Sequence, residues 1–363
     1  MHPGSKFFKN YYKDKRILVT GNTGFKGSWL CFVLKEMGAK VYGLSIDIPT
    51  KPSNFMCLKL NNSMKTFYGD VSNFNFFKKI VLIVKPEIIF HLAGQSIVFK
   101  SYQNPIETVN TNTNGVLNLM EILRYLKRRI NCVIVTSDKC YLAEKKVFFS
   151  ENDCLGGKDL YSASKASAEI FFKAYCDSFF INQKLIKICT ARAGNVIGGG
   201  DWSQDRIVPD IIKTIYKKKK LVLRNPNSNR PWQHVLEPIF GYLLLAKNLY
   251  KQNVNFNSFN IGPSTKKNKT VREISKLLFK KFNYKNSIIV RNKIKFSETS
   301  KLNLNTRKIN QTIGWKKILN QDLTFEFIAE WYKETVPIKK NLLINITKSQ
   351  INKFFNRAIN AIK

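Results

Sequence analysis

The chain of 363 residues is 44% hydrophobic, which is enough to bury one large core or two modest ones and favours two lobes. No run approaches the roughly 18 consecutive apolar residues of a membrane span, and the seven cysteines form no regular framework, so we expect a cytoplasmic protein without disulfides or a membrane partner. The net charge of +37 raises nucleic-acid binding as a hypothesis, but the lysines are spread along the chain without a nucleic-acid-binding motif. Three histidines are too few for a metal site built on several imidazoles. We therefore expect neither nucleic acid nor a metal.

The first half of the chain alternates short β-branched runs with helix-length amphipathic segments, the pattern of βαβ units in a parallel sheet. A strand is predicted at 16–20, followed by a helix at 24–37 that ends at Gly38. Later strands are predicted at 41–46, 65–71, 88–92, 132–137 and 185–191, with the clearest helices at 108–129 and 162–180. The predicted fold class is α/β, with a Rossmann-type doubly wound parallel sheet.

From about Gly194 the sequence changes to loops rich in Gly, Pro and Asn around shorter elements. This predicts a smaller C-terminal substrate-binding lobe at the carboxyl ends of the strands, where open α/β sheets bind ligands. Residues 1–193 are assigned mainly to the nucleotide-binding domain, 194–337 mainly to the smaller lobe and 338–363 to a tail of weak helical period. Segments near 235–261, a helix and then a strand, are expected to return to the first domain.

Three glycines follow the first strand. Gly21, Gly24 and Gly27 form G-x-x-G-x-x-G at the start of the helix. Glycine keeps such a turn tight and lets the backbone approach a pyrophosphate, whose charge the helix N-terminus favours. The alternative is an ordinary strand-to-helix turn, which the position after the first strand makes the weaker interpretation.

An acidic residue follows each of the next two predicted strands. Asp47 lies about where a carboxylate binds the adenosine ribose hydroxyls and would favour NAD over NADP; the alternative is a turn residue before Pro49. Asp70, before Val71, could meet an adenine amino group, or it belongs to the N-cap region of the next helix.

Tyr161 and Lys165 form Y-x-x-x-K, which places both side chains on one face of a helix. A nearby ammonium lowers the pKa of a phenol, so Tyr161 becomes a usable general base for a sugar hydroxyl, and the same lysine can reach a nicotinamide ribose. Ser137 at the end of a predicted strand completes the pattern.

These segments together resemble the extended short-chain dehydrogenase/reductase family: TGNTGFKG at 20–27, HLAGQ at 91–95, Ser137 and YSASK at 161–165. Within that family, longer strings are similar to the CDP-glucose 4,6-dehydratases: GFKGSWL at 24–30, TSDKCY at 136–141, LGG at 155–157, ARAGNVIGGGDW at 191–202 and RPWQHVLEP at 230–238. The resemblance runs from Lys15 to Tyr332.

The resemblance implies NAD as the cofactor, a nucleotide sugar as the substrate and a homodimer formed through sheet-flanking helices. The residues that it implies for NAD binding are Gly21, Gly24, Phe25, Gly27, Asp47, Asp70, Val71, Leu92, Ala93, Tyr161 and Lys165.

The implied reaction oxidises the hexose at carbon 4, eliminates water across carbons 5 and 6 and returns the hydride to carbon 6. Tyr161 would remove the carbon-4 hydroxyl proton, with Ser137 hydrogen-bonded to the same oxygen. Asp138 is the candidate acid for the departing hydroxyl. Lys139 would act as the carbon-5 base if neutral, and otherwise would stabilise the enolate electrostatically.

Substrate contacts are expected from planar or neutral donors suited to a diphosphate sugar. They are Gln95, Asn195, Arg206, Arg224, Arg230 and His234. Arg224 could equally be a solvated surface residue, and His91 is expected to be structural.

Three alternatives remain open. A non-catalytic NAD-binding relative is disfavoured because all the expected reacting side chains are present. A nucleotide-sugar 4-epimerase of the same fold also needs the tyrosine and lysine but needs no elimination acid, so Asp138 argues against it. A nucleic-acid-binding protein would explain the charge but neither the glycine turn nor Y-x-x-x-K.

Overall fold

The fold is described from a computed structural model of the 363-residue chain. Its described residues are 2–142, 148–263, 268–285, 287–290, 302–335 and 338–362. The predicted boundary of the tail at residue 337 and the two terminal residues lie outside the described residues.

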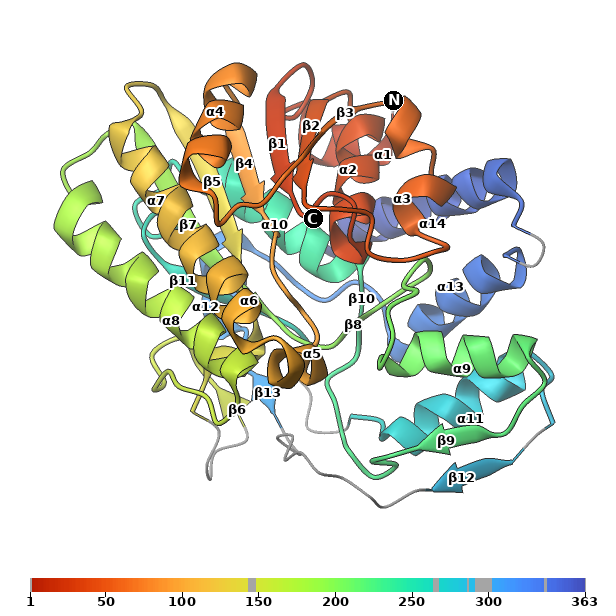
Figure 1. Ribbon diagram of the computed structural model, residues 1–363. Helices are drawn as coiled ribbons and strands as arrows, with labels where there is room; N and C mark the ends of the chain where they lie inside the picture. The colour runs from red at the N-terminus through yellow and green to blue at the C-terminus, as the bar shows by residue number, and fades with distance from the viewer. Residues whose placement is uncertain are drawn as a thin grey trace.

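A parallel sheet of seven strands forms the centre of the molecule (Figure 1). The strands are β1 (Arg16–Thr20), β2 (Lys40–Ser45), β3 (Lys65–Tyr68), β4 (Ile88–His91), β5 (Ile130–Val135), β7 (Ile186–Ala193) and β11 (Ser258–Ile261). Their order is β11-β7-β5-β4-β1-β2-β3, so the sheet grows outward in both directions from β1 and β4. The predicted α/β class with a Rossmann-type doubly wound sheet is confirmed.

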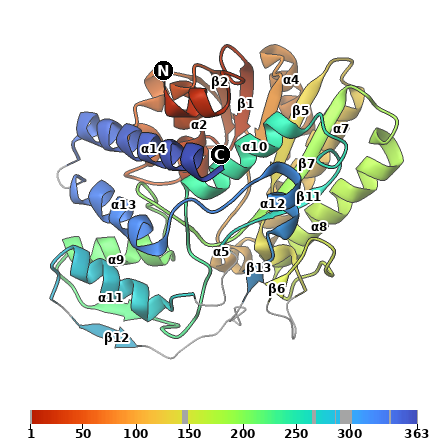
Figure 2. The ribbon, with the colours of Figure 1, turned by 180° about the vertical axis from the view of Figure 1, so that it is seen from behind.

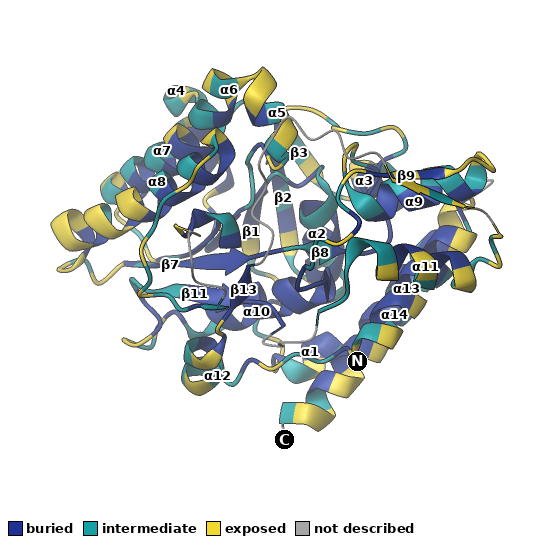
Figure 3. Ribbon diagram, turned by 90° about the horizontal axis from the view of Figure 1, so that it is seen from below, coloured by how far each residue is buried: buried dark blue, intermediate teal, exposed yellow. Residues whose placement is uncertain are grey.

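Helices pack on both faces of the sheet (Figures 1 and 2). They include α2 (Phe25–Glu36), α4 (Phe74–Val84), α7 (Gly115–Tyr125), α8 (Leu160–Tyr175) and α10 (Leu236–Asn248). The apolar residues of α4, α7 and α8 form one core with one face of the sheet, and those of α2 and α10 form a second core with the other face. Because both faces are covered, the central strands are buried apolar runs without polar alternation (Figure 3).

The helix that carries Tyr161, predicted at 162–180, begins at Leu160, directly after the N-cap residue Asp159. The Asp159 side chain accepts a hydrogen bond from Ser162 N at 2.9 Å, which satisfies a free N–H of the first turn of α8. The predicted helix at 108–129 is divided by a π-helical turn (Asn110–Asn114) between α6 (Pro105–Val109) and α7. Within the described part of the chain, no helix has the length and apolar character needed to cross a bilayer.

Residues 236–261 return to the sheet. β11 pairs in parallel with β7, and α10 packs against β5, β7 and β11. The smaller lobe consists of α9 (Ile207–Tyr216), β9 (Leu221–Leu223), α11 (Val271–Lys281), β12 (Ile288–Val290) and α13 (Gln321–Lys333). It lies beyond the carboxyl end of β1, where β1 leads into the glycine turn (Figure 1).

The remaining elements before the C-terminal segment are short. They are α1 (Pro3–Phe7), α3 (Asn54–Cys57), η1 (Leu60–Asn62), α5 (Val98–Gln103), η3 (Asp138–Cys140), β6 (Phe148–Phe149), η4 (Cys176–Phe180), β8 (Val196–Ile197), β10 (Gln233–His234), β13 (Asn303–Leu304) and α12 (Arg307–Ile313).

The C-terminal segment forms one long helix, α14 (Lys340–Ile362), which packs against α1, α3 and α13 (Figure 2). Phe354 and Phe355 are buried and meet Phe240 of α10 edge to face, with ring centroids 5.7 and 6.1 Å away. The helix therefore completes the core beneath the sheet.

We expect Phe354→Ala to lower the free energy of unfolding by about 3–5 kcal/mol, because it leaves a cavity in this aromatic cluster. Asn356→Ala, at an exposed position of the same helix, should change it by less than about 0.5 kcal/mol. Urea unfolding followed by circular dichroism measures both. Similar values for the two variants would show that α14 does not contribute to the core.

Candidate active site

A cleft of about 1490 Å³ separates the sheet from the smaller lobe. Its volume exceeds the roughly 300–1,000 Å³ of most small-molecule pockets, which leaves room for two ligands side by side. The predicted site residues that line it are Gly21, Gly24, Phe25, Gly27, Asp47, Asp70, Val71, Leu92, Ala93, Gln95, Ser137, Asp138, Lys139, Tyr161, Asn195, Arg206, Arg224 and Arg230. Residues predicted from distant parts of the sequence thus meet in one cleft.

The glycine turn is shaped by close packing. Gly21 has a φ of +71°, which favours glycine, and a Cβ at Gly27 would lie 2.0 Å from the Gly21 carbonyl oxygen. Ser45 holds the turn against β2, since its hydroxyl donates to Asn22 Oδ1 at 2.8 Å.

The first turn of α2 carries no acidic residue, and its N-cap Gly24 makes no side-chain capping bond. Its free N–H groups open onto the cleft, as the phosphates of a dinucleotide require. The residues present therefore fit a dinucleotide at this end.

The two acidic residues beyond β2 and β3 occupy different settings. Asp47 is exposed at the rim of the cleft, and its carbonyl accepts a hydrogen bond from Thr23 Oγ1 at 2.6 Å. Asp70 accepts from Ser72 N at 2.8 Å, while Asn73 is the N-cap of α4. Asp70 is thus a turn residue in the cleft wall, and the cap itself lies three residues later.

Tyr161, Ser137 and Asp138 form a buried polar group at the floor of the cleft, with exposed fractions of 7%, 6% and 2%. The Ser137 hydroxyl donates to Asp138 Oδ1 at 3.1 Å, and Asn195 Nδ2 approaches Asp138 Oδ2 at 3.5 Å. Asp138 therefore faces the same space as the Tyr161 phenol.

Burial raises the pKa of Tyr161 to about 12, and hydrogen bonding with the Ser137 side chain opposes this shift only partly. This differs from the lowered pKa that the Y-x-x-x-K pattern predicts, because removal of water from the phenolate outweighs the favourable contacts. Burial also lowers the pKa of Lys165 to about 8, against the opposing charge of Glu169.

Lys165 lies just behind the cleft wall. A Cβ at Gly94, which does line the cleft, would be 3.0 Å from Lys165 Nζ. Lys139 is half-buried in the cleft wall, in the short η3 turn, and its backbone N–H donates to Ser137 Oγ at 3.2 Å.

A buried ion pair, which sequence reasoning missed, lies beneath these groups. Arg192 Nη2 donates to Glu169 Oε2 at 2.8 Å, with exposed side-chain fractions of 4% and 0%. Glu169 also accepts hydrogen bonds from Thr136 and Thr190, and Arg192 Nη1 donates to Tyr141 OH at 2.9 Å. Burial opposes ionisation of Glu169, yet Arg192 and the hydroxyl donors outweigh it and lower the pKa of Glu169.

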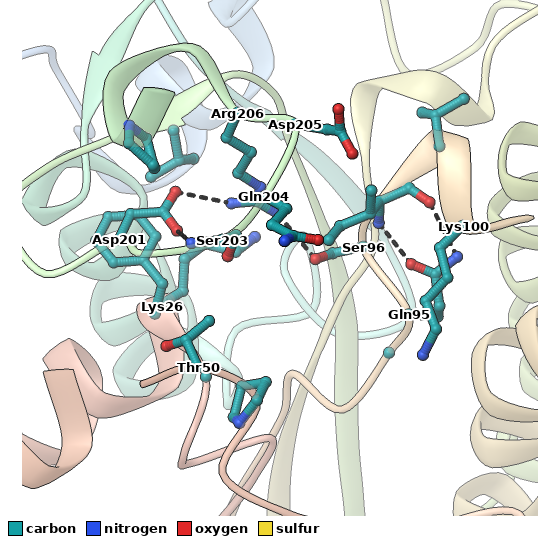
Figure 4. Close-up of a pocket in the computed structure, with 18 of the residues that line it drawn as sticks. Lys26, Thr50, Gln95, Ser96, Lys100, Asp201, Ser203, Gln204, Asp205 and Arg206 are labelled. Atoms are coloured by element: carbon teal, nitrogen blue, oxygen red, sulfur yellow. Dashed lines mark hydrogen bonds and ion pairs between the residues drawn. The ribbon is translucent and has the colours of Figure 1, made fainter. Parts of the chain in front are cut away.

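The predicted substrate side of the cleft is already rich in internal pairs (Figure 4). Arg206 donates to Asp201 Oδ2 at 3.3 Å and to Ser96 Oγ at 2.8 Å. Arg224 is exposed and pairs with Asp205 at 2.7 Å. Substrate phosphates would have to replace these carboxylates.

Two further predicted residues face the cleft in different ways. The side chain of Arg230 is buried in the cleft wall, and its Nη1 donates to Asn229 O at 3.3 Å. The Gln95 amide is engaged within its own loop, donating to Ile97 O at 3.0 Å and Thr108 Oγ1 at 3.1 Å. Gln95 therefore shapes the loop as well as lining the cleft.

The expectation for His234 is corrected by its position. The ring is fully buried between Trp29 and Phe327, with centroids 5.9 and 5.5 Å away, and does not line the cleft. Its Nδ1 accepts a hydrogen bond from Leu236 N at 3.3 Å, so the imidazole is used at the start of α10. Burial lowers the pKa of His234 to about 3, which keeps it neutral.

His91 is also buried, beside Thr20 Oγ1 at 2.9 Å. Sequence reasoning gave no role to Lys26 or Asp201, although both stand in strings that it singled out and both line the cleft. Glu169 follows Lys165 by one helical turn, and Arg192 lies in the family-like string 191–202. These two positions were the only signs of the ion pair in the sequence.

Known proteins match this chain over most of its length. Residues 18–326 match the model of a family described as GDP-mannose 4,6 dehydratase. The CDP-glucose 4,6-dehydratase of Salmonella typhimurium is 40% identical over 331 residues, 90% of this chain and 92% of that protein.

Two solved structures show the same fold. The dTDP-glucose 4,6-dehydratase of Streptomyces venezuelae, solved with NAD bound, has a TM-score of 0.76 at 19% identity and covers 89% of this chain and 100% of that one. The UDP-glucose 4-epimerase of Thermotoga maritima, solved with UDP-glucose, has a TM-score of 0.77 at 23% identity and covers 88% and 99%. Both dehydratases and epimerases therefore share this architecture.

We expect Glu169→Gln to lower the free energy of unfolding by about 3–5 kcal/mol, because it leaves the buried Arg192 charge uncompensated. The matched control on the same helix is Lys173→Met, which breaks a pair with Asp177 whose side chains are 66% and 55% exposed. The control should change stability by no more than about 1 kcal/mol. Chemical denaturation measures both, and equal effects would contradict the structural importance of the buried pair.

Proposed function

The chain belongs to the GDP-mannose 4,6 dehydratase family, and on that premise we propose that it is a hydro-lyase that converts CDP-D-glucose to CDP-4-dehydro-6-deoxy-D-glucose and water. The observation that carries the proposal is the buried Asp138 beside Tyr161 and Ser137 in one cleft. The identity with the Salmonella typhimurium enzyme supports CDP-glucose as the substrate.

NAD is the cofactor that fits the glycine turn and the uncapped start of α2. When bound there, it would supply a hydride acceptor for carbon 4 of the sugar and, once reduced, a hydride donor for carbon 6. Asp47 at the rim of the cleft is proposed to bind the adenosine ribose, and Asp70 and Val71 to contact the adenine. Phe25, Leu92 and Ala93 would pack along the dinucleotide.

In the oxidation step, Tyr161 removes the carbon-4 hydroxyl proton while Ser137 donates a hydrogen bond to the same oxygen. Because burial raises the pKa of Tyr161 to about 12, its phenolate needs positive charge nearby. Lys165, one helical turn away on α8, is proposed to supply that charge.

In the elimination step, a carbon-5 proton leaves and the carbon-6 hydroxyl departs as water. Asp138, in its protonated form, donates a proton to the departing hydroxyl. Lys139 as a neutral amine takes the carbon-5 proton and returns it to carbon 5 when the hydride reaches carbon 6. As an ammonium it would only stabilise the enolate, and the carbon-5 proton would need another acceptor. The adjacent positions of Asp138 and Lys139 in η3 support their action on neighbouring carbons.

We assign residues 1–193, with the returning segment 235–261, to NAD binding and most of 194–337 to the nucleotide sugar. Arg206, Arg224 and Arg230 are proposed to bind the diphosphate. Asn195 is proposed to bind either the sugar or the Asp138 carboxylate next to it. Arg206 directly precedes α9 and Arg224 directly follows β9, both elements of the smaller lobe, which supports this division.

The proposal includes a homodimer in the cytoplasm. A pairing surface on α8 is supported by Ile170 and Phe171, which are 53% and 39% exposed. The seven cysteines are free thiols, as expected in a reducing compartment.

Incubation of the purified protein with CDP-glucose should yield a product lighter by one water, with no net accumulation of NADH. GDP-, UDP- and dTDP-glucose serve as comparisons under the same conditions, with mass spectrometry and absorbance as the measurements. A product of unchanged mass with inverted carbon 4 would instead establish a 4-epimerase, the alternative that the fold allows.

Tyr161→Phe should abolish the reduction of bound NAD, lowering turnover by about 100- to 10,000-fold. Asp138→Asn should still reduce NAD in a single turnover but stall before water is lost. Asp177→Asn removes the same charge on η4 away from the cleft and should retain full activity. If both site variants kept full turnover, the assigned roles would be wrong.

A further inference from the structure

Lys26 is a cleft residue to which the reaction above gives no role. It is the second residue of α2, within the glycine turn, and its half-buried side chain lines the cleft on the side of Asp201 and Ser203 (Figure 4). Within the described residues its amine makes no hydrogen bond or ion pair.

The charges around Lys26 are mostly of the same sign. Lys165 and Arg206 repel its ammonium, and Asp138 is the carboxylate that attracts it. Burial and these two cations together lower the pKa of Lys26 to about 7. Arg206 already has Asp201 as its counterion, whereas Lys26 has none.

The helix adds to this positive field. A lysine in the first turn of a helix lies at the positive end of the helix dipole, where an acidic residue would be favourable. The first turn of α2 has no acidic residue. The Lys26 ammonium and the free backbone N–H groups therefore both present positive charge to the cleft. Such an arrangement is stabilised when an anion binds between them.

We propose that Lys26 is a diphosphate-binding residue, whose ammonium pairs with the phosphates of a ligand seated at the start of α2. The inference rests on the proposed function, which supplies two diphosphates to the same cleft, one in the dinucleotide and one in the nucleotide sugar. Arg206 and Arg224 must release Asp201 and Asp205 to bind phosphate, while Lys26 has no carboxylate to give up. Lys26 therefore contributes its charge without that cost.

Calorimetric titration of the ligand-free full-length protein distinguishes the two sources of diphosphate. ADP-ribose represents the dinucleotide and CDP the nucleotide sugar, while adenosine and cytidine lack the diphosphate. Lys26→Met should raise the dissociation constant of either ADP-ribose or CDP by at least about tenfold, as expected for loss of a charged hydrogen bond. The nucleosides should bind as they do to the unchanged protein.

Two matched variants separate charge from shape. Lys26→Arg keeps the charge and should retain most of the affinity. Lys35→Met removes a lysine from the other end of the same helix, outside the cleft, and should bind both diphosphates normally. Lys26→Met that folds normally and binds ADP-ribose and CDP within about twofold of the unchanged protein would overturn the proposal.

Two other readouts do not depend on affinity. Since the ligand-free Lys26 has a pKa of about 7 and an anion raises it, binding above that pH should take up a proton that Lys26→Met does not take up. Without ligand, Lys26→Met should be at least as stable as the unchanged protein, because it removes an uncompensated charge. A large loss of stability would show that Lys26 has a structural partner and would count against the proposal.

These binding measurements involve no turnover. A positive result for Lys26 combined with no dehydration of CDP-glucose would therefore reject the proposed reaction alone.

Discussion

The buried pair of Glu169 and Arg192 fixes the geometry on which the rest of the site depends. Glu169 lies one turn after Lys165 on α8, and its carboxylate accepts a hydrogen bond from Thr136, the residue before Ser137. Arg192 extends from β7 to Tyr141, which follows the η3 turn. One ion pair thus joins the helix that carries Tyr161 to both ends of the loop that carries Asp138. A relative displacement of these two elements would leave a charge without its partner in a medium of low dielectric constant.

The cleft combines this rigid floor with a wall in which charges are less completely matched. Arg206 pairs with Asp201 of its own loop and Arg224 with Asp205 of the loop before α9, whereas Lys26 lines the cleft and is repelled by Lys165 behind the cleft wall. Unmatched charge of this kind lowers stability and is retained at sites that use it. The overall charge of +37 is distributed along the whole chain, whereas the cations that line the cleft include Lys26, Lys139 and Arg206.

Features governed by local rules were predictable from the sequence. The glycine turn and Y-x-x-x-K depend on residues close in the chain, and β-branched runs predicted the strands of the sheet. Positions set by long-range packing were not. His234 was expected to contact the substrate as a neutral donor, but Trp29 and Phe327, from distant segments, enclose its ring. The raised pKa of Tyr161 likewise reflects burial, which no spacing within the helix reveals.

The packing of α14 against α1 joins the two ends of the chain in one core. Phe7 and Phe8 near the start meet Phe355 near the end, with ring centroids 6.4 and 6.1 Å away. During synthesis Phe7 and Phe8 emerge long before Phe355, so this part of the core cannot form until α14 has left the ribosome. The nascent chain must keep that apolar surface out of other contacts until then, and a chain truncated before α14 would expose it permanently.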